Sequence, residues 1–242
     1  MFRTQYNRIA EKYFKAETII KRYSILPTFL KLINKVEGLS VLDLACGSGY
    51  FTRRLKQKGA TKVVGIDISK EQIKIARDIE KERPLGIKYV VGDVKKLDIK
   101  KLGTFNLVTA VFLLNYAKNK EELYKMCRNI SNITNEFATI TANPFCPGFR
   151  YRKYEITKRV LGKLREGCKI KVTFYKDRKP YVNFYNYYWS KKTYQEILKK
   201  SGFKKIRFIK PIISKEGYEK FGKNFWRQFL EKPIFIGIKC KK

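Results

Sequence analysis

The stretch that decides the fold is Val41-Leu42-Asp43-Leu44-Ala45-Cys46-Gly47-Ser48-Gly49, which precedes a helical run at residues 50–58. Its first residues are apolar and predict a buried strand, and its two glycines predict a tight turn before the helix. Only glycine lets a backbone approach a ligand this closely, and the start of a helix adds free N–H groups. A strand, a Gly-x-Gly turn and a helix in this order predict a site for a nucleotide cofactor.

The same stretch indicates which nucleotide cofactor the site would bind. A dinucleotide fingerprint requires a third glycine three positions after Gly49, where this chain has Thr52. Asp43 would repel a pyrophosphate, whereas S-adenosylmethionine (SAM) has no phosphate and carries an ammonium and a sulfonium that attract a carboxylate. We therefore expect SAM as the cofactor. Within this stretch, the expected contacts are Asp43, Ala45, Cys46, Gly47 and Gly49.

Acidic side chains follow the next two predicted strands, where a SAM site requires them. Asp67 closes a strand at residues 62–66, and a carboxylate at that place can accept both ribose hydroxyls. A strand at residues 87–94 ends in an acid suited to the adenine amino group and a valine able to cover the ring. A buried strand within residues 105–116 leads into a loop beside the methyl donor. The series predicts further contacts by Asp67, Ile68, Asp93, Val94 and Val111, and turns without a ligand are the alternative.

Helices and strands alternate through the first 142 residues. Apolar residues at helical spacing predict one amphipathic helix over residues 4–20, and it could form a lid from which Tyr6 or Tyr13 contacts SAM. Ordinary core packing is the alternative for that helix. Further helices are predicted at residues 27–36, 50–58, 70–83 and 120–132, and a fifth strand at 136–142. Such alternation predicts a parallel sheet.

From residue 143 onward the pattern becomes rich in strands and aromatic residues. Residues 168–175 and 181–189 alternate in strand fashion around a hairpin turn at 176–180. The chain then predicts a helix at 191–201, a strand at 204–209, a helix at 214–230 and a strand at 234–240. We expect one domain, residues 1–242, made of a helical lid (1–37), a SAM-binding core (38–142), a β-rich aromatic cover with a helix (143–202), and C-terminal strands with an inserted helix (203–242).

Aromatic rings of the cover are the candidate contacts for an acceptor. A flat heteroaromatic molecule needs stacking partners, and aromatic faces stabilise a sulfonium. We expect substrate contacts from Tyr187, Tyr188, Trp189, Phe225 and Trp226, with packing between cover and sheet as the alternative for any single ring. The polar groups expected to orient the acceptor during catalysis are Asn115, Tyr116, Asn143 and Tyr188.

Residue composition excludes several kinds of chemistry. The chain has no histidine, so imidazole serves neither as a general base nor as a metal ligand, and we expect no metal. Five scattered cysteines without C-x-x-C spacing argue against a disulfide framework and a zinc cluster. No apolar run approaches the roughly 20 residues of a membrane helix, and the first residues lack the order of a signal peptide. We expect a cytoplasmic protein without a membrane partner.

The formal net charge of +34 has two interpretations. Residues 147–242 hold 28 basic and 7 acidic residues, and a basic face there would bind nucleic acid by releasing counterions from phosphates. The alternative is compositional drift, which we favour because lysines outnumber arginines 40 to 15 and are spread over every predicted helix. If the charge were functional, five basic residues of the cover would line one open face beside the methyl donor: Arg150, Arg152, Lys153, Lys158 and Arg159.

The pattern over about residues 38–142 resembles the class I SAM-dependent methyltransferases. Five segments together look like the toxoflavin-biosynthesis methyltransferase family, whose named member N-methylates an azapteridine: Tyr6-Asn7-Arg8-Ile9-Ala10-Glu11-Lys12-Tyr13, Leu44-Ala45-Cys46-Gly47-Ser48-Gly49, Leu113-Leu114-Asn115-Tyr116-Ala117, Asn186-Tyr187-Tyr188-Trp189-Ser190 and Lys223-Asn224-Phe225-Trp226. The resemblance implies a Rossmann-like α/β fold with helices on both faces of a seven-stranded, mostly parallel sheet. Its strand order would be 3-2-1-4-5-7-6 with the last strand antiparallel, and its acceptor a small molecule.

We therefore predict a SAM-dependent methyltransferase that acts on nitrogen or oxygen of a small heteroaromatic molecule by direct in-line displacement. An RNA methyltransferase that uses the basic surface is the first alternative. A protein methyltransferase and a non-enzymatic SAM-binding module are the others, and the oligomeric state does not follow from the sequence.

Overall fold

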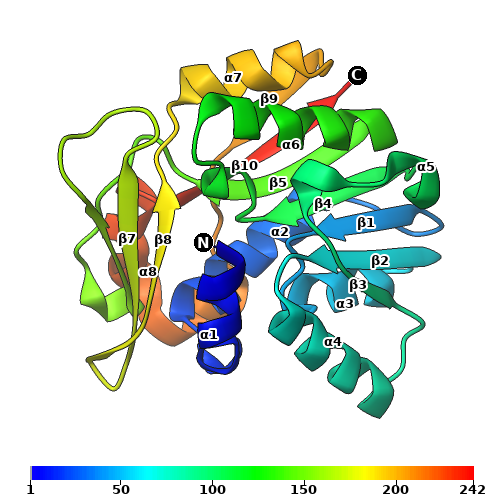
Figure 1. The fold of residues 1–242 in the computed structure, drawn as a ribbon. Helices are drawn as coiled ribbons and strands as arrows, with labels where there is room; N and C mark the ends of the chain where they lie inside the picture. The colour runs from blue at the N-terminus through cyan, green and yellow to red at the C-terminus, as the bar shows by residue number, and fades with distance from the viewer. Residues whose placement is uncertain (1) are drawn as a thin grey trace.

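A seven-stranded sheet forms the centre of the molecule (Figure 1). The computed structural model describes the backbone of residues 2–242 and the side chains of residues 5–98 and 100–242; Met1, the first residue of the predicted lid, lies outside them. In spatial order the strands are β3 (Lys88–Val91), β2 (Lys62–Asp67), β1 (Ser40–Leu44), β4 (Leu107–Val111), β5 (Glu136–Ala142), β10 (Phe235–Lys241) and β9 (Lys205–Ile209). Strand β10 runs antiparallel to both neighbours and the other pairs are parallel, so the predicted order and fold class are confirmed.

Helices cover both faces of this sheet. One face carries α5 (Ile99–Leu102), α6 (Lys120–Ile133) and α7 (Lys191–Lys200), and the other carries α2 (Leu26–Ile33), α3 (Tyr50–Gln57), α4 (Lys70–Glu82) and α8 (Lys215–Glu231). Successive side chains of a strand point to opposite faces, so Val41 joins the core under α2 while Leu42 joins the core under α6. Both are fully buried, which explains why β1 is apolar without alternation.

The chain reverses its direction of winding between β1 and β4. From β1 it proceeds to β2 and β3 on one side, and β4 and β5 lie on the other side. In sheets of this kind a crevice opens at the carboxyl ends of the strands where the order reverses. That place holds the glycine turn at residues 45–49 and the loop at residues 112–117. The fold therefore brings the two loops expected around the cofactor to one edge.

The N-terminal helix is shorter than predicted. Helix α1 (Phe2–Lys15) ends five residues before the expected position, because the backbone N–H of Ile19 donates to the carboxylate of Glu155 and Thr18 caps a new helix by accepting from the N–H of Lys21. The predicted second helix, residues 27–36, is present as α2 (Leu26–Ile33) with Pro27 in its first turn as expected, and it ends three residues early because Asn34 has a φ of 58°. Helix α2 continues from a wider π-type turn, η1 (Lys21–Ile25), and Pro27 lacks the N–H that an ordinary α turn requires there.

Two core strands are also shorter than their apolar runs predicted. Strand β3 stops at Val91, and the following residues form a short 3-10 turn, η2 (Val94–Lys96). Strand β4 stops at Val111 because Phe112 takes a left-handed conformation with φ 59°, and a second such turn, η3 (Leu114–Tyr116), follows. The residues that follow Val91 and Val111 are therefore loop residues, and they face the crevice.

The cover is a three-stranded antiparallel sheet, in place of the two strands expected. The predicted hairpin is present as β7 (Lys169–Lys176) and β8 (Lys179–Tyr187), and β6 (Ile156–Val160) pairs with β7 after a short turn, η4 (Arg152–Tyr154). Charged and polar residues in β6 hid its strand pattern. Figure 1 shows α1 crossing between this cover and the central sheet, and α1 packs against both α4 and β8.

The backbone conformation at the tip of the cover hairpin predicts how one substitution changes the free energy of unfolding. Asp177 and Arg178 both have positive φ, 51° and 60°, as a two-residue type I′ turn requires, and glycine is the favoured second residue. Arg178 is exposed, so Arg178→Gly should raise the free energy of unfolding by about 0.5 to 1 kcal/mol by removing backbone strain. Urea denaturation measures this change. Arg159→Gly, an exposed arginine inside β6, should lower stability, and a destabilised Arg178→Gly variant would contradict the turn assignment.

Candidate cofactor and acceptor site

Two cavities adjoin at the carboxyl ends of β1 and β4. The sheet cavity, about 120 Å³, is lined by residues that follow β2, β3 and β4, among them Asp67, Ile68, Gln72, Asp93 and Val94. The cover cavity, about 130 Å³, lies between the glycine turn and the inner face of the cover. Residues that line both cavities are Tyr13, Ala45, Gly47, Val111, Phe112 and Tyr116.

The glycine turn at residues 45–49 needs its glycines for two separate reasons. Gly47 and Gly49 have φ of 54° and 86°, the left-handed region where side chains are disfavoured. A Cβ on Gly49 would also overlap the hydroxyl of Tyr89, which lies beneath the turn. Gly49 immediately precedes the first residue of α3, so the turn leaves the free N–H groups of that helix at the crevice.

Asp43 is buried beneath this turn and is held by two hydroxyls. The Thr52 hydroxyl donates to one carboxylate oxygen at 2.6 Å and the Thr109 hydroxyl to the other at 2.8 Å. Thr52 lies in α3 and Thr109 in β4, so the carboxylate links three elements. Burial raises the pKa of Asp43 to about 6, although the hydroxyl bonds oppose that change. The charged form is thus present at neutral pH at a cost in stability.

This burial predicts how the stability of an Asp43 variant depends on pH. Because the pKa of Asp43 is raised, the folded state gains stability by binding a proton at low pH, and loses that gain as pH rises through about 6. An asparagine does not titrate and can still bond both threonines. The melting temperature of Asp43→Asn minus that of the wild type should therefore be higher at pH 7.5 than at pH 4.5.

Thermal melts at both pH values check this, with the exposed Asp98→Asn as a matched control that should show no such difference. A relative melting temperature that falls as pH rises would contradict the cost assigned to the buried carboxylate.

Asp67 and Asp93 both line the sheet cavity, and each also organises a backbone turn. Asp67 accepts from the N–H of Gly47 and from the N–H of Ser69, each at 2.9 Å, and burial raises its pKa. Asp93 accepts from the N–H of Lys95 at 2.9 Å, while Val94 beside it is buried. A carboxylate offers about four lone-pair positions, so both acids keep acceptor capacity toward the cavity.

A buried glutamine that the sequence did not single out completes the sheet cavity. Gln72, 2% exposed, donates through Nε2 to the carbonyl of Ala10 and leaves Oε1 without a hydrogen-bond partner. An unpaired buried acceptor is unfavourable, so this oxygen is a candidate for a ligand donor. Gln72 lies on α4 and Ala10 on α1, and the bond fixes α1 over the cavity.

Aromatic residues of α1 separate the two cavities. The Tyr13 ring stacks on Phe174 at 5.7 Å between centroids and meets Phe184 edge-on at 5.6 Å. The Tyr6 hydroxyl is hydrogen-bonded to that of Tyr116, the loop residue after β4. Burial raises the pKa of Tyr13 to about 12, so this phenol is neutral at physiological pH. The structure thus brings together the predicted Tyr6, Tyr13 and Tyr116.

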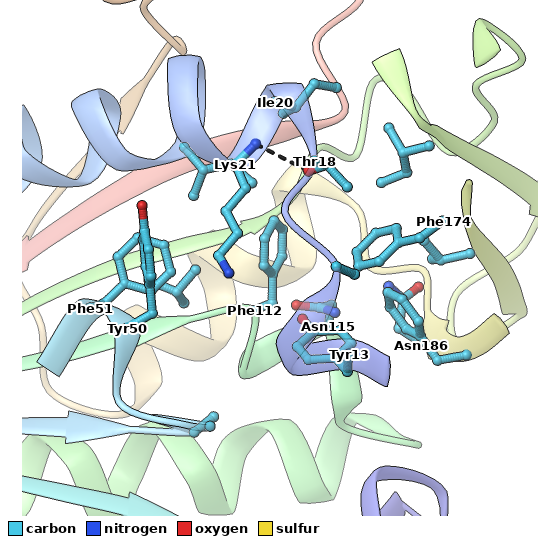
Figure 2. A pocket seen from close by; sticks show the side chains of 18 of the residues that line it. Tyr13, Thr18, Ile20, Lys21, Tyr50, Phe51, Phe112, Asn115, Phe174 and Asn186 are labelled. Carbon is cyan, nitrogen blue, oxygen red and sulfur yellow. Dashed lines mark hydrogen bonds between the residues drawn. The ribbon is translucent and has the colours of Figure 1, made fainter. Parts of the chain in front are cut away.

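The cover cavity is lined by the inner face of the three-stranded cover. Val172 pairs with both Lys158 and Phe184, which forms one inward row, and Phe174 belongs to the next row. Figure 2 shows the rings of Phe112 and Phe174 and the amides of Asn115 and Asn186 around this cavity. The lining is mainly apolar and aromatic, with isolated polar groups, as expected around a small organic molecule.

Several predicted acceptor contacts lie elsewhere. Trp189 is buried and donates to the carbonyl of Ala117, and Trp226 is fully buried and donates to the carbonyl of Gly217. The ring of Phe225 packs on Tyr154, 5.0 Å between centroids. These contacts are internal packing, and none of the three rings is among the residues that line the two cavities.

The remaining predicted residues divide between the cavities and the core. Tyr187 and Tyr188 pack into or against the two cores, and Asn143 bonds the carbonyl of Pro233 and the N–H of Phe145. Asn115 does line the cover cavity, where its Nδ2 has no hydrogen-bond partner. Of the four predicted orienting groups, Asn115 and Tyr116 therefore reach the crevice.

Two lysines line the cover cavity, and the sequence did not indicate that either lies there. Lys21 is half-buried, with its ammonium 4.3 Å from the centre of the Tyr50 ring, and Figure 2 shows it pointing into the cavity. Lys158 is one of the five residues that a functional basic face would place in the open, but it is only 5% exposed. The other four, Arg150, Arg152, Lys153 and Arg159, are exposed. Alternation along β6 was the available signal, because it places Lys158 on the same face as Ile156.

Comparison with known proteins identifies the core. Residues 41–136 match the family described as a methyltransferase domain. A ubiquinone biosynthesis O-methyltransferase from Chromobacterium violaceum is 27% identical over 130 residues, which are 52% of this chain and 56% of that protein. The chain therefore aligns with just over half the length of this curated relative.

Solved structures share the fold over the whole chain. The CcbJ methyltransferase from Streptomyces caelestis aligns with 99% of this chain and 98% of its own, with 13% identity and a TM-score of 0.69. The magnesium protoporphyrin IX methyltransferase from Synechocystis PCC 6803, with bound SAH, aligns with 98% and 85%, with 15% identity and a TM-score of 0.54. The match over residues 41–136 confirms the predicted methyltransferase domain, and the SAH bound in the Synechocystis structure agrees with the expected cofactor, SAM. The toxoflavin-family resemblance stays a prediction.

No metal cluster contributes to this picture within the described side chains. Among them, no group of three or more His, Cys, Asp or Glu residues is arranged to hold a metal ion. Likewise, no helix in residues 2–242 is both long and apolar enough to cross a membrane.

Proposed function

We propose that this chain transfers the methyl group of SAM to a nitrogen or oxygen atom of a small, planar heteroaromatic molecule. The observation that carries the proposal is the meeting of two cavities at Tyr13 and Tyr116, one lined by acids at strand ends and the other by aromatic rings. The first suits a nucleoside and the second a flat acceptor. SAM supplies a methyl carbon already activated by its sulfonium, so the protein needs chiefly to bind and align.

The proposed roles of the cofactor residues follow from their positions. Asp67 would accept the ribose hydroxyls, and Asp93 the adenine amino group, with Val94 against the ring. Asp43, at the other side of the glycine turn, would attract the ammonium of the methionine part. Lys21 lines the same cavity and would pair with the methionine carboxylate.

The acceptor would react by direct displacement. A lone pair on its nitrogen or oxygen forms the new bond to the methyl carbon while the carbon–sulfur bond breaks, leaving a thioether, and any proton lost by the acceptor passes to solvent. Phe112, Phe174 and Phe184 would hold the acceptor ring and exclude water, and Asn115 would orient it through its unpaired amide. The absence of histidine favours an acceptor that needs no strong base.

The resemblances support a small-molecule acceptor and differ over its reacting atom. The toxoflavin-biosynthesis family suggests a nitrogen, and the ubiquinone biosynthesis O-methyltransferases suggest an oxygen. An azapteridine is planar and aromatic, which agrees with the ring-lined cover cavity.

Substitution of Asp67 tests the proposed cofactor site. Asp67→Asn keeps the size of the side chain and acceptors for both N–H bonds, but removes the charge offered to the ribose hydroxyls. SAM affinity should fall roughly 10- to 100-fold, the value of a hydrogen bond to a charged group. Titration calorimetry with SAM and with NAD measures this, and Asp78→Asn is the matched control, an acid on α4 whose side chain is 47% exposed and pairs with Lys74. Tight NAD binding, or SAM affinity indifferent to Asp67, would reject the assignment.

The acceptor class is tested by turnover on a mixed panel. Labelled SAM is incubated with azaheterocycles, with phenols and with total RNA, and RNA binding is followed across a salt series. We expect turnover on small aromatic molecules and RNA binding that is lost near physiological salt, because diffuse surface charge is screened. RNA binding that persists at 0.2 M salt, without small-molecule turnover, would replace this proposal by the RNA methyltransferase alternative.

A further inference from the structure

Lys158 has an unusual environment for a lysine. It lies on β6, and its ammonium donates to the carbonyl of Cys146 at 2.7 Å and to the carbonyl of Ile234 at 3.3 Å. No ion pair formed by the described side chains includes it. An ammonium has three N–H groups, so one remains after these two bonds. A cation that is 95% buried with no carboxylate partner is costly to the folded protein.

The register of the cover directs this side chain to the acceptor side. Lys158 is paired with Val172, and Val172 is paired with Phe184, so the three side chains share the inward face. All three line the cover cavity. Asp43 lines the same cavity from the β1 side, and Thr52 and Thr109 already bond its two oxygens. The ammonium of Lys158 therefore lies in the wall that the cover contributes to the cavity, opposite Asp43 and β1.

Two buried amides add a second, independent observation. Asn115, fully buried, has no partner for Nδ2, and Asn186, 4% exposed, has none for Oδ1. Both line the cover cavity, and Figure 2 shows both amides turned toward it. The apolar surroundings otherwise offer these groups no partners. The cavity thus presents one ammonium N–H and the two N–H groups of the Asn115 amide as donors to a ligand oxygen, and the Oδ1 of Asn186 as an acceptor.

We propose that the acceptor carries an anionic oxygen group, such as a carboxylate, and that Lys158 is the specificity-determining residue that binds it. This inference rests on the proposed function and narrows its substrate class. An anionic oxygen would accept the free N–H of Lys158 and compensate its buried charge, and the amide of Asn115 would be a second donor. Burial lowers the pKa of Lys158 to about 8, and an anionic ligand would restore the charged form.

Matched pairs of ligands test the inference on the wild-type protein. Each pair consists of a planar acid and its neutral amide of nearly the same shape: nicotinate and nicotinamide, benzoate and benzamide, 4-hydroxybenzoate and 4-hydroxybenzamide. Binding is measured by calorimetry with SAH present. We expect at least one acid to bind roughly tenfold or more tightly than its amide, as for a charge-assisted hydrogen bond. Equal affinities within every pair, or no binding of any of them, would overturn the inference.

Variants at Lys158 assign the preference to this residue. Lys158→Met keeps the length of the side chain without its charge, and should reduce the acid-to-amide ratio to near one. Arg159→Met, the next residue on β6, is exposed and should leave the ratio unchanged. Because the ratio is taken within one variant, a general loss of stability does not alter it. An acid preference that survives in Lys158→Met would overturn the inference.

A measurement of SAM binding distinguishes failure of this inference from failure of the proposed function. Wild-type protein that binds SAM and methylates small aromatic molecules, but prefers neutral ones, would reject the role of Lys158 alone. Wild-type protein that binds no SAM would reject the proposed function itself. If Lys158→Met does not fold, the wild-type ligand pairs still decide, and Lys158→Arg, which keeps the charge, should retain the acid preference.

Discussion

The carboxylate of Asp43 is the interaction on which the rest of the site depends. It lies in β1, and its bonds to Thr52 and Thr109 join β1 to α3 and to β4 at the place where the sheet reverses its order. Those two neighbours support the glycine turn and the loop after β4, two backbone segments that line both cavities. Burying a charged carboxylate is unfavourable. The two hydroxyl bonds that offset this cost hold β1, α3 and β4 in fixed positions around the crevice.

The N-terminal helix connects the cofactor side to the acceptor side. Tyr13 lines both cavities and packs on two rings of the cover, and Gln72 ties the backbone of α1 to α4 beside the sheet cavity. A ligand donor that bonds the free Oε1 of Gln72 would leave the bond from Nε2 to Ala10 in place. Helix α1 therefore forms part of the wall of both cavities.

Sequence reasoning predicted the core well because the core obeys local rules. Apolar strands followed by Asp67 and Asp93 define both the parallel sheet and the crevice, and the structure brings these acids to one cavity. Sequence reasoning failed where contacts between distant residues set the structure. No local pattern predicts that Glu155 accepts a hydrogen bond from the N–H of Ile19, which ends the first helix. In the cover, aromatic density drew attention to Trp189 and Trp226, although strand alternation identifies Phe184 and Asn186 as the inward pair.

The charge of the protein illustrates why burial decides function more than composition does. Exposed lysines and arginines act through water, where salt screens them within about 10 Å. Lys21 and Lys158 contribute only two of the 55 basic residues, but burial lowers the pKa of both and places their charges where water cannot replace a ligand. A net charge counts all 55 residues alike. The two lysines that line the cover cavity are distinguished by the faces of η1 and β6 that carry them, which is information the fold supplies.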